Sequence, residues 1–485
     1  MSKATRLIVI LLLPALFGSL AVHAHIGSPT VFYEGNAGPY NLRVTIRPPE
    51  VVPGRAQINV RVHNGPVARV TVLPVRWDAG RKGAPPPDFA APVDGETNLF
   101  NAELWLMDFG AYSVFVEVVG ERGHGTAIVP LNSVAQKRLQ MSPALAVMFL
   151  VAGSVLVLLL VFIIGSAVRE SVLPPSVPPG QLRNRRARFA MAGAVLVISL
   201  AMWRGNAWWA EVDAEFRNNR LFKPIEISTE LRVDGPRAIL ALKSDATESD
   251  WRDQTPLVAD HGKLMHLFLI RGDMESFAHL HPKRVGDDIA FEAALPALPP
   301  GEYSVYGEVT HESGLARTLV SSITIPELPR DVAAVPADPD DSWWPVAAGN
   351  SAEVSVRQLV PGPFFAGQEV TLRFDALAPD GQPALLEPYM GMWSHAVVRA
   401  VDGSVFTHLH PSGTISMAAQ ELFARRERGE DLRKPIDVVC GRPQRELIFP
   451  YLFPRPGQYR MWVQVKVAGK IVTAPFDIEV QAPAS

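Results

Sequence analysis

One long uncharged stretch limits what this 485-residue chain can fold into more than any other feature. Pro143 to Val168 carries no charged side chain, and a helix of that length, at about 1.5 Å per residue, crosses a hydrocarbon core about 30 Å thick. A second uncharged run, Phe189 to Trp203, is shorter, but the arginine and tryptophans that follow can extend it into the interface. The sequence therefore predicts two transmembrane helices in a lipid bilayer, over 143–168 and 189–209.

The segment between these runs, 169–188, predicts their orientation. It is rich in proline and carries five arginines against a single acid, Glu170. Short loops with an excess of arginine stay in the cytoplasm, so the chain before 143 and after 209 is expected outside. The predicted location is the bacterial inner membrane, with the soluble parts on the periplasmic side.

The N-terminus agrees with export. Lys3 and Arg6 precede an apolar run from Leu7 to Leu20, and small residues follow up to Ala24, which are the features of a secretory signal peptide over 1–24. Cleavage there would leave His25 as the first residue; an uncleaved anchor is the alternative.

Charge and cysteine content exclude other classes. The formal net charge of −3 gives no reason to expect nucleic acid as a partner. The single cysteine, Cys440, excludes an internal disulfide framework and a multi-cysteine zinc site, and we interpret it as a buried small apolar residue.

Outside the predicted helices the sequence is typical of β-structure. Short alternating runs of β-branched and aromatic residues are separated by proline and glycine, and three similar segments each start with a turn glycine: Gly110–Phe115, Gly301–Tyr306 and Gly457–Trp462. We therefore expect a mainly β fold of three antiparallel, immunoglobulin-like β-sandwich modules plus the two transmembrane helices. The predicted modules are 25–137, 215–327 and 350–482, with a linker at 328–349 and an insertion at 412–443 whose helix, Ser416 to Arg428, ends at Gly429. The charged end of that insertion, 425–431, is interpreted as a solvated helix face.

A histidine pattern occurs twice. HLFLIRGDMESFAHLHP (266–282) and HAVVRAVDGSVFTHLHP (395–411) each hold three histidines, at intervals of thirteen and two residues. A two-residue turn at Asp402-Gly403 would place His395 opposite His410, and one at Gly272-Asp273 would place His266 opposite His279. In either register strand alternation directs all three rings of a hairpin to one face.

Three converging imidazoles form a donor set that zinc or copper prefers. The predicted metal ligands are His266, His279, His281, His395, His408 and His410; the alternative is a structural role with hydrogen bonds to the protein. His261 could assist from an upstream loop, whereas His311 is expected on the surface. No acidic residue takes a matching position in both copies, so no general base is marked.

Methionine favours copper over zinc. Met390 and Met392 precede His395 in YMGMW, and thioether sulfur selects for copper, although methionine also fills cores. His25, with a free amine after cleavage, is a further candidate that could bind copper together with His63 or His124.

The residues Met265 to Arg271, Phe277 to Pro282 and Pro300 to Tyr303 resemble the YtkA-like and FixH-like family of exported bacterial domains. The similarity is best over 260–325 and fair over 390–475. It implies a small β-sandwich, often tethered to a membrane, with roles in copper handling or in the maturation of respiratory oxidases, and a metal site at the six histidines above. A pair of helices between modules departs from the family's usual single anchor.

The sequence thus favours a membrane-anchored periplasmic protein that binds a transition metal, copper or alternatively zinc, for buffering, sensing or delivery. Its partner would be a membrane metalloprotein or an oxidase complex. The competing interpretations are an assembly factor whose histidines bind no metal and a tri-histidine metalloenzyme; the missing acid or base makes the enzyme less favoured.

Overall fold

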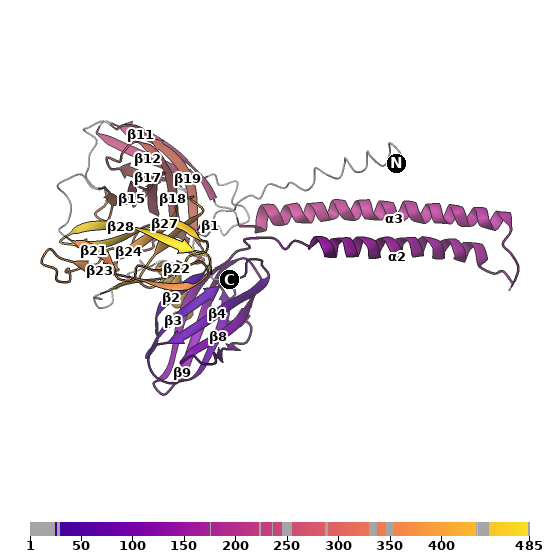
Figure 1. The fold of residues 1–485 in the computed structure, drawn as a ribbon, viewed down its shortest axis with the longest axis horizontal. Coiled ribbons are helices and arrows are strands. Elements are labelled where there is room, and N and C mark those ends of the chain that lie inside the picture. The colour runs from indigo at the N-terminus through magenta and orange to yellow at the C-terminus, as the bar shows by residue number, and fades with distance from the viewer. Residues whose placement is uncertain are drawn as a thin grey trace. The chain divides into compact units, whose positions relative to one another are not determined.

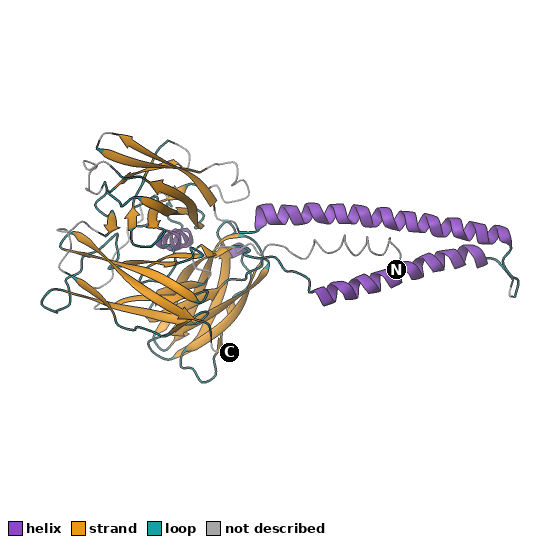
Figure 2. Cartoon of the chain, turned by 45° about the horizontal axis from the view of Figure 1, so that its top comes forward, coloured by secondary structure: helices purple, strands orange, loops and turns teal. Residues whose placement is uncertain are grey.

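The computed structural model describes residues 25–26, 30–174, 176–222, 225–234, 236–244, 255–286, 290–328, 337–345, 354–432, 434 and 446–483. The predicted signal peptide and Cys440 lie outside the described residues. The chain divides into a helical unit, 50–52 and 134–223, and a β unit, 1–49, 53–133 and 224–485. Figure 1 shows the two units as a ribbon, and Figure 2 shows their helices and strands.

The helical unit contains α2 (Pro143–Glu170) and α3 (Gln181–Glu215), followed by a short π-helical turn (Phe216–Arg220). Ser142 caps α2 by accepting a hydrogen bond from the Leu145 N–H at 3.3 Å. Both helices are long and apolar enough to cross a membrane, and only 6% of the most apolar stretch of each is buried. Because so much exposed apolar surface is unfavourable in water, these helices suit a membrane anchor.

Helix α3 is longer than predicted. It begins at Gln181 rather than 189 and ends at Glu215 rather than 209, so four arginines of the predicted loop 169–188 lie in its first turns. Arginine and alanine are good helix formers, which explains why RNRRARFA extends the helix. The loop between the helices is thereby reduced to 171–180.

The β unit makes the protein mainly β, as expected, and it has several sheets. Its first β-region, 30–133, has a five-stranded sheet of order β2-β3-β4-β8-β7 and a four-stranded sheet of order β10-β9-β5-β6. Alternate residues face the other sheet, so one core lies between the two. The strands are β2 (Val31–Ala37), β3 (Tyr40–Arg47), β4 (Gly54–Val62), β5 (Val67–Arg76), β6 (Asp88–Phe89), β7 (Ala91–Pro92), β8 (Leu99–Leu106), β9 (Gly110–Gly120) and β10 (Gly123–Ser133).

The second β-region, 225–345, forms a ten-stranded sheet of order β16-β17-β12-β11-β19-β18-β14-β15-β20, with β13 beside β18. The strands are β11 (Ile225–Asp234), β12 (Arg237–Ser244), β13 (Leu257–Val258), β14 (His266–Arg271), β15 (Phe277–Leu280), β16 (Lys283–Arg284), β17 (Ala290–Leu295), β18 (Gly301–His311), β19 (Ala316–Ile325) and β20 (Ser342–Trp344). Strand β20 pairs with β15. The predicted linker 328–349 therefore contributes a strand to this sheet.

The third β-region, 354–483, has a six-stranded sheet of order β1-β25-β24-β27-β28-β22 and a three-stranded sheet of order β21-β23-β26. Its first strand, β1 (His25–Ile26), comes from the N-terminal end of the chain and runs parallel to β25. The others are β21 (Ser355–Gln358), β22 (Phe364–Phe365), β23 (Glu369–Leu377), β24 (His395–Ala400), β25 (Val405–Leu409), β26 (Leu447–Leu452), β27 (Gly457–Val467) and β28 (Lys470–Gln481).

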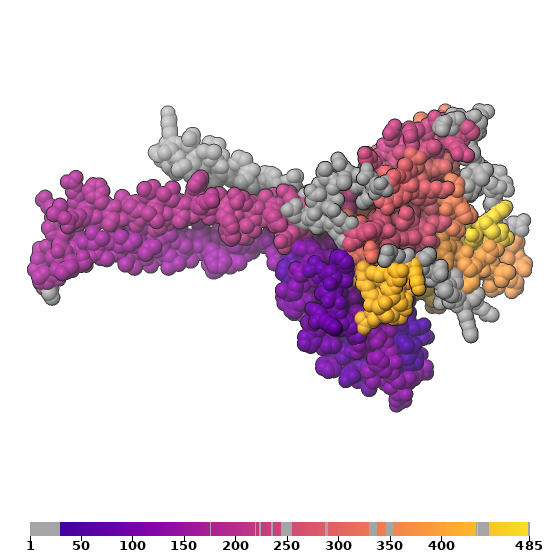
Figure 3. Space-filling view, turned by 180° about the vertical axis from the view of Figure 1, so that it is seen from behind, coloured from indigo at the N-terminus to yellow at the C-terminus, as the bar shows by residue number. Residues whose placement is uncertain are grey.

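Helix α4 (Met417–Arg428) confirms the predicted helix of the insertion. Ser416 caps it by accepting a hydrogen bond from the Ala419 N–H, and Gly429 ends it in a left-handed conformation with φ of 67°. The Ser416 hydroxyl also donates to Asp260 of the second β-region at 2.7 Å, and Gln420 donates to the Ile128 carbonyl of the first at 3.0 Å. Figure 3 shows this orange segment in contact with the indigo first β-region.

The charged end of α4, 425–431, is the expected solvated face only in part: 427–431 are exposed, whereas Arg425 is buried and Arg426 is half-buried. Arg425 is 8% exposed and pairs with Glu421, four residues earlier, at 2.9 Å. The guanidinium of Arg426 lies over the rings of Trp77 and Phe423. These arginines therefore fasten the helix to its neighbours instead of facing water.

A short contact joins the first and third β-regions at Gly413. The Glu34 N–H donates to the Ser412 carbonyl at 2.8 Å, and the Thr414 N–H donates to the Phe32 carbonyl at 3.0 Å. A Cβ atom on Gly413 would lie 2.0 Å from the Phe32 carbonyl oxygen, and the φ of Gly413 is 113°. Only glycine fits there, because both the space and the backbone angle exclude a side chain.

We expect Gly413→Ala to destabilise the protein by more than about 2 kcal/mol, since overpacking adds to backbone strain. Gly110→Ala is the matched control: Gly110 has a φ of 117° and nothing within 4 Å of its virtual Cβ, so it carries the backbone cost alone. Thermal unfolding of the two variants measures the difference. Equal losses would show that the contact at Gly413 contributes nothing.

Candidate metal centre

The hairpin of β24 and β25 has the predicted register. Val397 pairs with His408 and Ala396 with Leu409, so the next pair outward is His395 with His410. The turn holds four residues rather than two: the Gly403 N–H donates to the Ala400 carbonyl at 2.9 Å.

The register predicted for the hairpin of β14 and β15 is wrong. Phe268, not His266, pairs with His279, so the next pair outward from Leu267 and Leu280 is His266 with His281. The Met274 N–H donates to the Arg271 carbonyl at 2.8 Å, and Met274 takes a positive φ of 64°. A non-glycine residue rarely adopts this conformation, so the turn chemistry gave no sign of it. Both hairpins therefore have the same register and the same loop length.

The two hairpins face each other. His266 and His408, from different β-regions, have ring centroids 5.5 Å apart, and those of His279 and His395 are 6.5 Å apart. All six predicted histidines are buried, as is His261. Two separate three-histidine sites were expected. The structure instead brings seven imidazoles together in one buried cluster between the second and third β-regions, which we call the chamber.

The first group in the chamber is His266, His279 and His281, whose candidate ligand atoms lie within 4.8 Å of one another. His266 Nε2 lies 3.2 Å from the Asp260 carbonyl, which can only accept, so this nitrogen carries the proton. His279 Nδ1 lies 2.9 Å from Gln464 Oε1 and likewise donates. Both of these rings thereby keep one nitrogen unprotonated.

Those two unprotonated nitrogens, His266 Nδ1 and His279 Nε2, lie 3.2 Å apart. Two lone pairs that face each other repel, whereas a tetrahedral ion with bonds of 2.0–2.1 Å needs its nitrogens about 3.3 Å apart. His281 Nδ1 donates to Asp341 at 3.0 Å, which leaves its Nε2 without a partner among the described residues. A carboxylate that fixes the tautomer of a ring in this way is typical around metal ligands.

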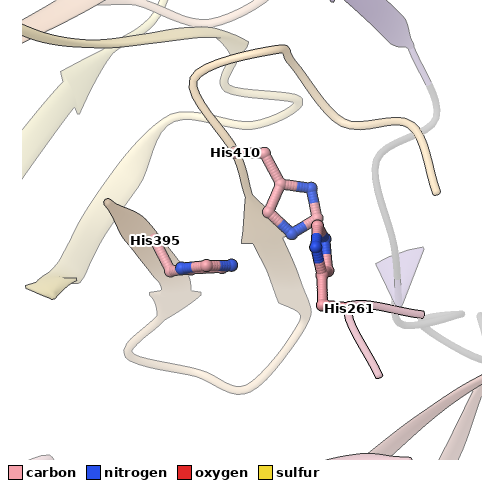
Figure 4. A group of neighbouring side chains, drawn as sticks. All are labelled: His261, His395 and His410. Atoms are coloured by element: carbon pink, nitrogen blue, oxygen red, sulfur yellow. The ribbon is translucent and has the colours of Figure 1, made fainter. Parts of the chain in front are cut away.

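The second group is His261, His395 and His410, again within 4.8 Å of one another (Figure 4). The ring centroid of His261 lies 5.5 Å from that of His395 and 4.9 Å from that of His410. Neither ring nitrogen of His395 has a hydrogen-bond partner in the part of the chain that the structure describes. The Met390 backbone lies beside the His261 ring, without a hydrogen bond of good geometry between them.

His408 is not part of the group of His261, His395 and His410 whose candidate ligand atoms lie within 4.8 Å of one another. Its Nδ1 donates to Glu308 of the second β-region at 3.0 Å, and its Nε2 is buried without a partner among the described residues. Its ring centroid lies 4.5 Å from that of His410 and 5.5 Å from that of His266. His408 therefore lies between the two groups.

Burial keeps five of these rings neutral. It lowers the pKa of His261 and lowers the pKa of His266, His279, His395 and His410 well below the usual value; the positive charge that neighbouring imidazoles would carry adds to the effect. Only the unprotonated ring offers a lone pair to a metal ion. The chamber therefore holds these five histidines in the form that binds metal.

Acids beside the chamber are engaged with the protein. Asp341 is bound to His281, and Asp338, which could join these two around an ion, pairs with Lys263 at 2.5 Å. Lys263 also lies 3.3 Å from Asp340. The three aspartates, Asp338, Asp340 and Asp341, come from the predicted linker, whose sequence carries no pattern that marks a site.

The remaining candidates have different places. The backbone of His25 pairs with Val405 in β1 and β25. Met390 and Met392 are buried in a turn closed by hydrogen bonds between Tyr389 and Met392. His311, expected on the surface, is 2% exposed, and its Nδ1 lies 2.6 Å from the Thr255 carbonyl.

We expect the metal-free protein to lose thermal stability as the pH falls below about 6.5. The unfolded chain binds protons near that pH, but the lowered pKa values keep the folded chamber from doing so, so acid favours unfolding and stability levels off above pH 7. Unfolding midpoints in the presence of a chelator measure this. His395→Gln should flatten the pH dependence, whereas His124→Gln, at an exposed position, should not; equal slopes would contradict the assignment.

Comparisons with known proteins identify no function. The model of one family, described as Domain of unknown function (DUF8832), matches residues 234–326 and 350–482. No curated protein matches the chain. Among solved structures, an α2-macroglobulin from Escherichia coli is 9% identical with a TM-score of 0.18, over 96% of this chain and 24% of that one. A tandem repeat of a large adhesion protein (9%, TM-score 0.16, over 88% and 71%) and a putative membrane anchored protein from Corynebacterium diphtheriae (9%, TM-score 0.14, over 91% and 92%) are also similar. At these TM-scores the structural similarities carry no argument.

Proposed function

We propose that the chain is a membrane-anchored protein that binds transition metal ions, copper first and zinc second, between its second and third β-regions. The observation that carries this proposal is the 3.2 Å distance between His266 Nδ1 and His279 Nε2. Both nitrogens are unprotonated, because the other nitrogen of each ring carries the single proton and donates it to Asp260 or Gln464. Without an ion this arrangement is repulsive; with one it is a tetrahedral ligand pair.

The ligand set favours copper and zinc over harder metals. Two groups consist of imidazoles alone, and imidazole suits copper, zinc, iron and nickel, whereas magnesium and calcium prefer oxygen. The carboxylates beside the chamber already bind His281, His408 or Lys263. We prefer copper because two methionines lie in the turn before β24.

The place of the chamber suggests a role in sensing or buffering more than in rapid delivery. All seven rings are buried, so an ion would exchange slowly with the solvent. Ligands come from both β-regions, since His261 groups with His395 and His410. Metal occupancy would therefore stabilise the contact between the two regions.

The proposal also includes the orientation of the chain in the membrane and its resemblance to a family of exported domains. We infer three immunoglobulin-like modules on the periplasmic side of the bacterial inner membrane, anchored by α2 and α3. The arginines at the start of α3 support this orientation, because positively charged ends of transmembrane helices stay in the cytoplasm. The resemblance to YtkA-like and FixH-like domains would then place the protein near copper handling or oxidase maturation, with a membrane metalloprotein as partner.

Metal titration of the full chain in detergent tests the proposal. We expect saturable binding of Cu(I) or Zn(II), one ion for each all-histidine group. His266→Ala/His281→Ala should remove one equivalent and His395→Ala/His410→Ala the other. Each double variant should also lose the part of the metal-induced rise in melting temperature that its own ion contributes. One site adds about 2.7 kcal/mol to the free energy of unfolding when the free ion is present at 100 times its Kd.

His63→Ala/His124→Ala is the matched control, since these histidines lie in the first β-region, away from the chamber, and are largely exposed. It should bind metal as the unchanged protein does. Absence of binding near neutral pH by the unchanged protein would overturn the proposal and favour the assembly factor without metal.

A further inference from the structure

The second and third β-regions meet through contacts that occur in pairs. Glu308, opposite His266 in the sheet, accepts a hydrogen bond from His408 of the other region at 3.0 Å. Gln464, opposite His395, accepts one from His279 at 2.9 Å. Each region thus offers the equivalent residue to the equivalent histidine of its neighbour.

Aromatic stacking repeats the same exchange. The rings of Tyr306 and Phe406 stack at 3.9 Å, and those of Trp462 and Phe277 stack at 5.0 Å. Each pair lies two residues before the hydrogen-bonded pair on the same strands. The two regions are therefore related by an approximate two-fold axis that passes through the chamber.

The turns before β14 and β24 are counterparts as well. His261 and Met390 both take a positive φ, 53° and 50°, and each is followed by a glycine at 79° or 76°. Paired backbone hydrogen bonds close the turns, between Asp260 and Lys263 and between Tyr389 and Met392. His261 and Met390, each five residues before the first histidine of its hairpin, hold the same position.

His261 reaches across the interface to His395 and His410. The approximate two-fold axis exchanges these residues for Met390, His266 and His281. Met390 is 7% exposed, and its backbone lies beside the His261 ring, so the two turns meet near the axis. The symmetry therefore predicts that the Met390 thioether faces the group of the opposite hairpin and not the hairpin that follows it in the sequence.

We propose that Met390 completes the group of His266, His279 and His281, so that the chamber holds two unequal metal sites: one with three imidazoles and a thioether, the other with imidazoles alone. This inference rests on the proposed function and specifies it. Thioether sulfur is a soft ligand that favours Cu(I), whereas imidazole nitrogen serves Cu(II) and Zn(II) as well. The first site is therefore selective for Cu(I), and the second accepts either metal.

Met390→Leu separates the two sites because leucine keeps the volume and removes the sulfur. We expect one equivalent of Cu(I) to bind at least about tenfold more weakly, measured against a competing chelator, and Zn(II) binding to stay unchanged. The copper-edge X-ray absorption spectrum should lose its copper–sulfur path. Met265→Leu is the matched control: Met265 directly precedes His266 but packs in the core of the second β-region, so both metals should bind as before.

The outcomes distinguish this inference from the proposed function. Full-chain protein in detergent that binds two ions, with Cu(I) affinity and copper–sulfur path unchanged in Met390→Leu, overturns the inference and leaves the metal centre standing. Loss of the sulfur path in Met392→Leu instead would also overturn it. Absence of any metal binding by the unchanged protein overturns both. Met390→His should make the two sites alike and raise the affinity of the first for Zn(II), and a fall in that affinity would contradict the shared position.

Discussion

Seven imidazoles removed from water between two packed β-regions are the constraint on which the rest of this structure depends. A buried polar atom without a partner costs about 1–3 kcal/mol, and neither nitrogen of His395 has one among the described residues. The surrounding protein offsets part of this cost: Asp260, Asp341, Glu308 and Gln464 each hold one ring by its outer nitrogen. Among the nitrogens that remain without a partner in the described residues, the one lone pair of each neutral ring can bind a cation.

The sequence predicted the elements of this site better than their assembly. Strand alternation placed each set of three histidines on one face, and the helical composition from Ser416 with the stop at Gly429 predicted helix α4 within a residue. Those signals are local and depend on a few neighbouring residues. The register of the hairpin of β14 and β15 failed because Met274 takes a glycine-like angle that its side chain gave no reason to expect.

What the sequence could not predict is long-range. His261 and Asp341 carry no motif, and their roles arise only because two similar β-regions pack with their hairpins opposed. The two copies do carry one further local signal. The turn Asp260-His261-Gly262 aligns with Tyr389-Met390-Gly391, and an equivalence between a histidine and a methionine at a fixed distance before each hairpin is a signal in the sequence alone. The face-to-face contact itself is tertiary and has no such signal.

The internal repeat also explains why the two halves of the chamber share backbone features but carry different side chains. The two hairpins share their register, their loop length and the positive φ angles of their turns, whereas side chains at equivalent positions differ: Glu308 against Gln464, and His261 against Met390. A duplicated unit can keep its fold and change only the donor atoms that it presents.

Asp260 connects the chamber to helix α4 and, through that helix, to the first β-region. Its carbonyl accepts the hydrogen bond from His266, while its carboxylate accepts from the Ala418 N–H at 3.1 Å and from Ser416 at the start of α4. Gln420 of the same helix donates a hydrogen bond to the Ile128 carbonyl of the first β-region. A continuous series of hydrogen bonds therefore runs from the His266 ring through Asp260 and α4 to the first β-region, so the position of a metal-binding ring is tied to a part of the fold that offers no ligand.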